Sequence, residues 1–128
     1  MCYYIEISYD LRKHNYSDFK KKLYDLGEKY KAYRMYEDFE INGIERNVKR
    51  NHCILTFIFN EDDIKYIEKF LRNVQKLCKI YVECIYTDLY ILYASKNYQR
   101  MCPNFKKEQI KIHNHEIIIL SHLKNNLC

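Results

Sequence analysis

The sequence predicts one domain of the α+β class over residues 1–128, and three observations support this prediction. A chain of 128 residues has a common domain size, and its 48% of hydrophobic residues can build a core. With only 2 glycines and 1 proline, the chain offers little material for linkers. Apolar residues recur with period two in some segments and with a helical period in others. We expect a core over residues 1–95 and a C-terminal extension over residues 96–128.

The first half of the core predicts a strand, a helix and a β-hairpin. Residues 3–9 alternate between apolar and polar side chains, as a half-buried strand does. Ser17 is a suitable helix N-cap, an apolar stripe at helical spacing follows it, and Gly27 is the expected end of this helix. Period two returns from Lys31, and Asn42-Gly43 predicts a type I′ turn between the second and third strands.

The second half of the core predicts a strand, a helix and another strand. Residues 52–59 are apolar on both faces, which indicates a central strand that is at least partly covered on each side. Asn60 is the expected N-cap of a second helix, whose apolar stripe runs from Ile64 to Cys78. Residues 80–86 predict the fourth strand.

Two later segments predict further β-structure. Residues 89–94 indicate a fifth strand after a turn at Thr87-Asp88, and residues 110–120 indicate either a hairpin turned at Asn114 or one strand. The predicted order is that of a ferredoxin-like βαββαβ sandwich, with an antiparallel sheet, two helices on one face and an extra C-terminal strand or hairpin. Because such a fold carries many unrelated functions, it does not decide what the protein does.

The sequence carries no signal for secretion or for a membrane. The first residues lack a basic segment followed by an apolar one, so we expect no signal peptide. The longest apolar run, residues 117–120, is far too short to span a bilayer. We therefore expect a cytoplasmic protein, located in the host cell if its source is a virus, with no membrane partner.

The 6 cysteines form no recognisable metal or redox motif. No two of them have the short spacing that places two thiolates on one turn of a zinc or redox site. In a cytoplasmic protein we expect them to be reduced and mostly buried. Two glycines also cannot build a glycine-rich phosphate loop, so we expect no cofactor.

Tyr9-Asp10-Leu11, at the end of the first predicted strand, resembles the corresponding segment of two families. These are the small CRISPR adaptation subunit and the virulence-associated protein D ribonucleases, ferredoxin-like proteins in which a Tyr-Asp or Phe-Asp pair closes the first strand. The resemblance covers roughly residues 3–86. It implies a metal-dependent nuclease in which Asp10 is the catalytic, metal-proximal carboxylate and approaches its own copy across a homodimer. It also implies that residues 89–94 extend the partner's sheet.

The residues by themselves allow a simpler interpretation of Asp10, which is that it ends a strand and opens a loop. A divalent metal is expected only if the protein is a nuclease. The segments at residues 34–37 and 42–51 depart from the pattern of the two families.

His113 and His115 are the other candidate metal ligands. On one face of a strand they would bind a divalent metal, with Glu116 or Cys102 nearby. Exposed histidines beside a turn are the interpretation we favour, so we predict no metal site here.

A mildly basic surface is a further feature that bears on function. The chain has 22 Lys and Arg against 17 Asp and Glu, a net charge of +5. Arg46, Lys49 and Arg50 cluster at the predicted hairpin tip, where they would contact phosphates, and Tyr33 and Tyr36 would stack on bases. The alternative for such a cluster is a solvated basic surface.

We predict a small nucleic-acid-binding protein, acting as a homodimer and more simply explained without enzymatic activity. Two alternatives stay open. The first is a protein-interaction module, such as a viral accessory factor or an assembly subunit, because the 14 tyrosines suit recognition surfaces. The second is the metal-dependent nuclease that uses Asp10.

Overall fold

The structure is a computed structural model that describes residues 1–10, 16–45, 48–77, 80–121 and 123. Within these ranges the side chains of residues 9–10, 16–17, 38–45, 48–53 and 101 are not described. The α+β class is confirmed: a five-stranded antiparallel sheet combines with α-helices and short 3-10 helices. No helix in the described ranges is long and apolar enough to cross a membrane.

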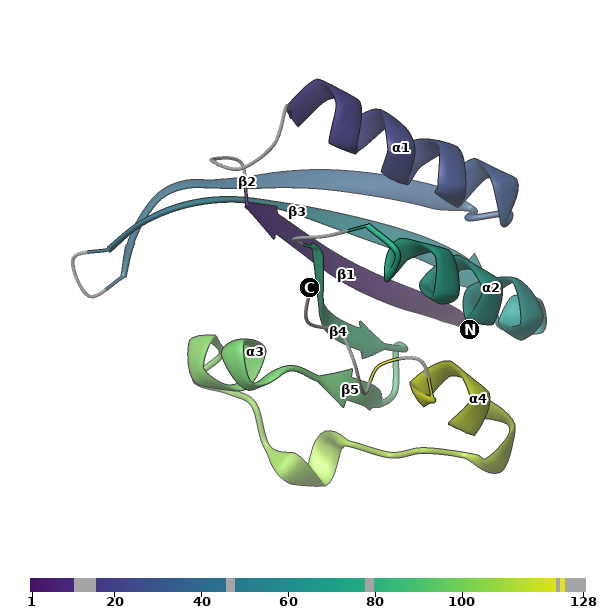
Figure 1. Ribbon diagram of the computed structural model, residues 1–128. Helices are drawn as coiled ribbons and strands as arrows, with labels where there is room; N and C mark the ends of the chain where they lie inside the picture. The colour runs from purple at the N-terminus through teal and green to yellow at the C-terminus, as the bar shows by residue number, and fades with distance from the viewer. Residues whose placement is uncertain (11–15, 46–47, 78–79, 122, 124–128) are drawn as a thin grey trace.

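The sheet has the strand order β2-β3-β1-β4-β5 (Figure 1). β1 (Cys2–Asp10) lies in the middle, between β3 (Val48–Asn60) and β4 (Ile80–Tyr86). β2 (Arg34–Glu45) pairs with β3 at one edge, and β5 (Ile91–Ala94) pairs with β4 at the other. The predicted strand over residues 52–59 is therefore an interior strand, as its apolar residues on both faces indicated.

Helices α1 (Tyr16–Lys29) and α2 (Ile64–Val74), the latter led by the 3-10 turn η1 (Glu61–Asp63), cover one face of the sheet. The ring of Phe70 in α2 lies 4.9 Å from that of Phe57 in β3, centroid to centroid. This "covered face" consists of alternate strand residues that are almost fully buried: Tyr3, Ile5, Ile7, Leu55, Phe57 and Phe59. The "open face" carries the intervening residues, among them Tyr4, Glu6, Ser8, Thr56 and Tyr86.

β2 and β3 form the expected hairpin, but the predicted turn at Asn42-Gly43 is wrong. Pairing continues through Gly43, which lies opposite Arg50, to Glu45, which lies opposite Val48. A register shift between Ile41 and Gly43 accommodates the segment within the ladder. The continued backbone hydrogen bonding outweighs the local turn preference of Asn-Gly.

The predicted end of the first helix at Gly27 is also wrong, because α1 continues to Lys29. The residue with positive φ is Lys31, at 63°. Its N–H donates to the Glu28 carbonyl over 3.2 Å, and the Ala32 N–H donates to the Gly27 carbonyl over 2.8 Å. This pair of hydrogen bonds is the Schellman ending of a helix, with lysine in the position that usually holds glycine.

Gly27 serves the packing of α1 on the sheet. A Cβ at this position would lie 2.8 Å from the sulfur of Met35 and 2.8 Å from the ring of the buried Phe57. Both distances are shorter than van der Waals contact, so only glycine lets the helix approach the covered face this closely.

The C-terminal tail does not form the strand or hairpin predicted over residues 110–120. After α3 (Lys96–Met101) and η2 (Lys107–Gln109), the chain forms η3 (Asn114–Glu116) and α4 (Ile117–Leu120). Within α4, Ile119 is fully buried in the core beside α2, whereas Ile117 and Ile118 are exposed. Burial of one isoleucine in a consecutive run suits a helical turn, and the position of this turn depends on Glu116, described below.

Candidate nucleic-acid interface

An exposed cluster at the β2 edge of the sheet brings together both predicted base-stacking tyrosines. The guanidinium carbon of Arg34 lies 5.9 Å from the ring centroid of Tyr33 and 5.8 Å from that of Tyr36. Arg34 Nη1 also donates to the Tyr36 hydroxyl over 2.9 Å. Tyr33 is 66% exposed and Tyr36 47% exposed. We call these three residues the tyrosine–arginine cluster, and sequence analysis had not singled out its arginine.

The predicted phosphate-binding residues fall on the far end of the β2–β3 hairpin. β1 ends where Asp10 pairs with His52, and beyond this point β2 and β3 continue as a two-stranded ribbon (Figure 1). Lys49 and Arg50 belong to the β3 arm of the ribbon, and Arg46 lies outside the described residues. The backbone thus places Lys49 and Arg50 on a projecting arm; how the three side chains lie is not described.

The ribbon and the tyrosine–arginine cluster share one strand but are not adjacent. Gly43, opposite Arg50, is seven residues along β2 from Tyr36. This separation is roughly 23 Å at about 3.3 Å per strand residue. A ligand that contacts both regions must therefore be extended.

Asp10 is the last residue of β1, as the resemblance to the nucleases requires, but its side chain lies outside the described residues. In the part of the chain that the structure describes, no group of three or more His, Cys, Asp or Glu could hold a metal ion. Asp10 thus remains a prediction from sequence.

A second pair of aromatic residues occupies the middle of the open face. The rings of Tyr4 and Tyr86 stack, with centroids 4.9 Å apart and planes 8° from parallel. The Tyr4 hydroxyl donates to Asp88 Oδ1 over 3.1 Å. The register places this pair in one row with Ile58 and Arg34, so the row leads from the tyrosine–arginine cluster to the centre of the sheet.

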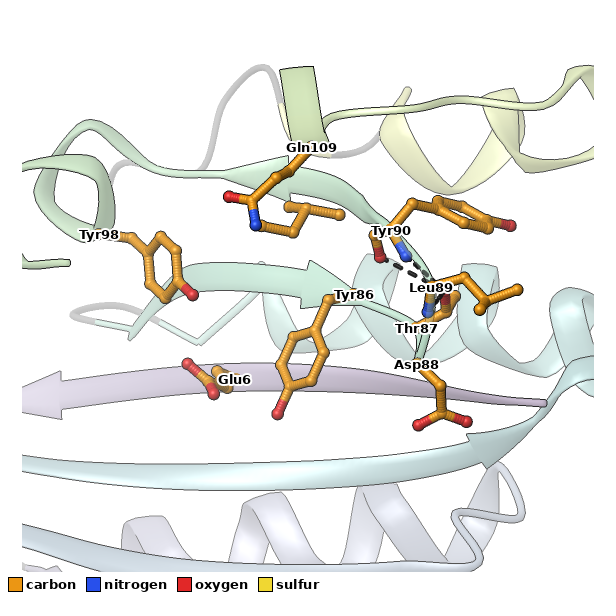
Figure 2. Close-up of a pocket in the computed structure, with 9 residues that line it drawn as sticks. Glu6, Tyr86, Thr87, Asp88, Leu89, Tyr90, Tyr98 and Gln109 are labelled. Carbon is orange, nitrogen blue, oxygen red and sulfur yellow. Dashed lines mark hydrogen bonds between the residues drawn. The ribbon is translucent and has the colours of Figure 1, made fainter. Parts of the chain in front are cut away.

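A cleft of about 420 Å³ opens beyond this stack, between the sheet and the tail. Figure 2 shows Glu6 and Asp88 on the two sides of the Tyr86 ring. Burial, the charge of Glu6 and a hydrogen bond with Glu6 together raise the pKa of Tyr86, which stays protonated near neutral pH. The described lining contains two carboxylates and no lysine or arginine, so this side of the open face disfavours phosphate groups.

Glu83, which does not line the cleft, is a nearly buried carboxylate of the open face. It accepts hydrogen bonds from Ser8 Oγ at 2.8 Å, from Ser95 Oγ at 2.7 Å and from Asn97 Nδ2 at 3.3 Å. Ser95 is also the N-cap of α3, because its hydroxyl accepts from the Tyr98 N–H. Glu83 therefore fixes the start of α3 against the sheet.

Glu116 is a fully buried carboxylate on the covered face. Its Oε2 accepts from the Tyr3 hydroxyl at 2.6 Å and from the Tyr90 hydroxyl at 2.5 Å, and its Oε1 accepts from the His113 N–H at 3.0 Å. Burial alone would raise the pKa of Glu116, but these hydrogen bonds and one to the His113 ring lower it below its usual range. The ionised carboxylate therefore ties the tail to β1 and to the β4–β5 connection.

The histidines of this segment lie beside a turn and are exposed, as we favoured. His113 and His115 are 54% and 61% exposed, and their rings are 5.8 Å apart. His113 Nδ1 lies 3.1 Å from the Glu116 carboxylate, which already accepts two phenolic hydrogen bonds. This geometry supports a structural role for the histidines.

Three of the cysteines lie among the described side chains, and all three are free thiols: Cys84 is buried, whereas Cys2 and Cys102 are partly buried. Burial, with the nearby charge of Glu6, raises the pKa of Cys84 to about 12. Cys84 therefore stays protonated and is a poor nucleophile.

Comparison with known proteins gives no match to any protein family, to any curated protein or to any solved structure. The resemblance to the two nuclease families therefore rests on the sequence features described above.

Sequence analysis missed the two buried carboxylates and the cleft. Glu83 follows the strand alternation of its neighbours, and Glu116 lies beside histidines that drew attention as metal ligands. The one local signal for Glu116 was its spacing of three residues after His113, which is that of a capping box.

Proposed function

We propose that this protein binds nucleic acid, as a homodimer built on a ferredoxin-like scaffold, through the β2 edge and the β2–β3 ribbon. The observation that carries the proposal is the tyrosine–arginine cluster, in which one guanidinium lies within 6 Å of the centroids of two exposed phenol rings. Exposed aromatic rings stack on unpaired bases, and guanidinium groups bind phosphates or stack on bases.

The charges beside the sheet limit where a phosphate backbone can lie. Glu6 and Asp88 line the cleft beside Tyr86, and they would repel a phosphate backbone. β2 carries Arg34 but also four acidic residues, Glu37, Asp38, Glu40 and Glu45, whereas the β3 arm of the ribbon carries Lys49 and Arg50 in sequence. We therefore expect phosphates near the basic residues of the ribbon and bases at the cluster.

The test is fluorescence anisotropy with short single- and double-stranded DNA and RNA over a range of salt concentrations. We expect salt-dependent binding that is stronger for single strands. Replacing Arg46, Lys49 and Arg50 by Gln should weaken binding about tenfold or more and reduce the slope of log affinity against log salt by about 2 to 3.

A matched control removes the same three charges elsewhere. Lys21, Lys22 and Lys69 are exposed on α1 and α2, so changing them to Gln alters the net charge equally without touching the ribbon. If the control triple variant loses as much affinity as the ribbon variant, binding is not localised to the ribbon and the proposal is wrong. Complete absence of binding at low salt would favour the protein-interaction module instead.

A further inference from the structure

The cleft beside the open face is a concave site with walls from three parts of the chain. Glu6 belongs to β1, residues 86–91 form the end of β4 and its turn into β5, and Gln109 belongs to the tail. The Lys111 N–H donates to the Ile91 carbonyl over 2.9 Å, which holds the tail beside this turn. The volume of about 420 Å³ lies within the range of small-molecule sites.

Two carboxylates of the cleft are separated by an aromatic ring. Figure 2 shows Glu6 and Asp88 on the two sides of Tyr86. Glu6 lies opposite Cys84 in the register, and Asp88 is four residues beyond Cys84. Their backbone positions are therefore up to roughly 13 Å apart along the strand, at about 3.3 Å per residue. A ligand that contacts both carboxylates must extend across the ring.

Hydrogen bonds to two phenols hold these carboxylates in place. The Tyr4 hydroxyl donates to Asp88 Oδ1 over 3.1 Å, and Tyr86 forms a hydrogen bond with Glu6. The rings of Tyr4 and Tyr86 stack with their planes 8° from parallel, so the two phenols are fixed relative to each other. An ionised carboxylate has about four acceptor positions, so each of the two can also accept from the N–H groups of a ligand.

The charge of the cleft is negative. Glu6 and Asp88 are the charged residues of its lining in the part of the chain that the structure describes. Four basic residues lie two positions along the chain from a lining residue, but none of them lines the cleft: Lys96, Arg100, Lys107 and Lys111. The cleft therefore attracts cations and disfavours anions.

We propose that this cleft binds a linear alkyl diammonium ion, a small molecule with a protonated amine at each end. One ammonium group pairs with Glu6 and the other with Asp88, and the methylene chain lies across the Tyr86 ring. Each ammonium group supplies three N–H donors to carboxylate oxygens, and the ring gives an apolar contact that also attracts positive charge.

This site goes beyond the proposed nucleic-acid binding and is separate from it. The cleft lies at the β4–β5 side of the sheet, whereas the tyrosine–arginine cluster lies at the β2 edge. A ligand in the cleft therefore requires neither the ribbon nor the cluster.

The experiment is isothermal titration calorimetry at low salt in the absence of nucleic acid, whose phosphates also attract diamines. The probe is 1,5-diaminopentane, and pentylamine, with the same chain and one ammonium group, is the matched ligand. We expect one saturable site that binds the diamine about fivefold or more tightly than the monoamine, because only the diamine contacts both carboxylates.

Glu6→Gln and Asp88→Asn each remove one charge and keep the size of the side chain. In either variant the diamine should bind about fivefold more weakly, and its advantage over pentylamine should disappear. The matched control, Asp25→Asn with Glu28→Gln, removes two charges from the exposed surface of α1, which covers the opposite face of the sheet. It should leave the affinity within about twofold of the native value, and circular dichroism establishes that each variant is folded.

The inference is overturned if the diamine shows no saturable binding below about 10 mM, or if pentylamine binds as tightly as the diamine. It is also overturned if the α1 control loses as much affinity as the single variants, since the attraction would then be diffuse. Amide NMR spectra locate the ligand independently. The diamine should shift the signals of residues 86–91, and shifts confined to other segments would contradict the proposed site.

Discussion

Two buried carboxylates, Glu116 and Glu83, lie on opposite faces of the same sheet, and each attaches a part of the C-terminal region to it. Both accept hydrogen bonds from two side-chain hydroxyls and at least one N–H donor. Glu116 is fully buried on the covered face, whereas Glu83 is 9% exposed on the open face. Because the two carboxylates accept similar hydrogen bonds, a comparison of their surroundings shows which segment each one stabilises.

Each carboxylate has one donor in β1, far along the chain: Ser8 is 75 residues from Glu83, and Tyr3 is 113 residues from Glu116. The nearer donors differ. Ser95 and Asn97 follow Glu83 by 12 and 14 residues, whereas Glu116 itself lies in the tail, 26 residues after its donor Tyr90. Losing Glu116 should therefore release a longer segment than losing Glu83.

The largest expected effect is that of Glu116→Ala. It leaves the Tyr3 and Tyr90 hydroxyls without their acceptor in the interior, and should lower the free energy of unfolding by about 3 kcal/mol. Glu83→Ala should lower it by about 1 to 2 kcal/mol, because two of its three donors, Ser95 and Asn97, are only partly buried. Urea unfolding monitored by circular dichroism measures both values, and a larger loss at Glu83 would contradict the comparison.

An intermediate effect is expected from pH. The pKa of folded Glu116 lies below its ordinary value of 4.5, so the ionised carboxylate stabilises the protein above that pH. The contribution is lost as the pH falls below about 4.5 through the folded pKa, because protonation then occurs first in the unfolded chain. The stability difference between the native protein and Glu116→Gln, measured by urea unfolding, should shrink in that range. A constant difference from pH 6 to pH 3 would argue against an ionised Glu116.

The smallest effects should come from removing one donor at each site. Tyr90→Phe deletes one hydroxyl that donates to Glu116. Burial, together with this hydrogen bond and the charge of Glu116, raises the pKa of Tyr90 to about 12. Ser95→Ala deletes a donor to Glu83 and the N-cap of α3 together. Each should cost about 1 kcal/mol.

Amide hydrogen exchange locates each of these losses. Faster exchange should follow in α4 for Tyr90→Phe and in α3 for Ser95→Ala. Faster exchange in α3 for Tyr90→Phe and in α4 for Ser95→Ala would show that Glu116 and Glu83 do not stabilise the segments they contact.

Sequence analysis predicted a strand or helix correctly where the local pattern of apolar residues agrees with the burial of that element in the fold. The apolar pattern of residues 80–86 predicted the strand β4, although a register shift opposite Glu6 and Ile7 breaks its alternation, and the apolar stripe after Ile64 predicted α2. The role of Tyr33 and Tyr36 in binding stays a prediction; the structure shows that both are exposed. Sequence analysis did not single out Arg34, whose proximity to both rings is a property of the fold.

Sequence analysis failed where a contact between residues far apart in the chain overrides a local conformational preference. Asn42-Gly43 favours a turn, but its neighbours pair across a continuing ladder. Gly27 favours a helix end, but the close approach of Phe57 requires glycine within the helix. The run at residues 117–120 reads as a strand, but a carboxylate held by Tyr3 and Tyr90 places it as a helical turn.

The sequence by itself determined the α+β class, the strands of the core and the basic, tyrosine-rich character of the chain, since period and composition are local properties. The tertiary structure alone decided the sheet order, the place of the tail and the meeting of Arg34 with its two tyrosines. These depend on which distant residues lie close enough to pack or to share a hydrogen bond, and such proximity is a property of the folded chain.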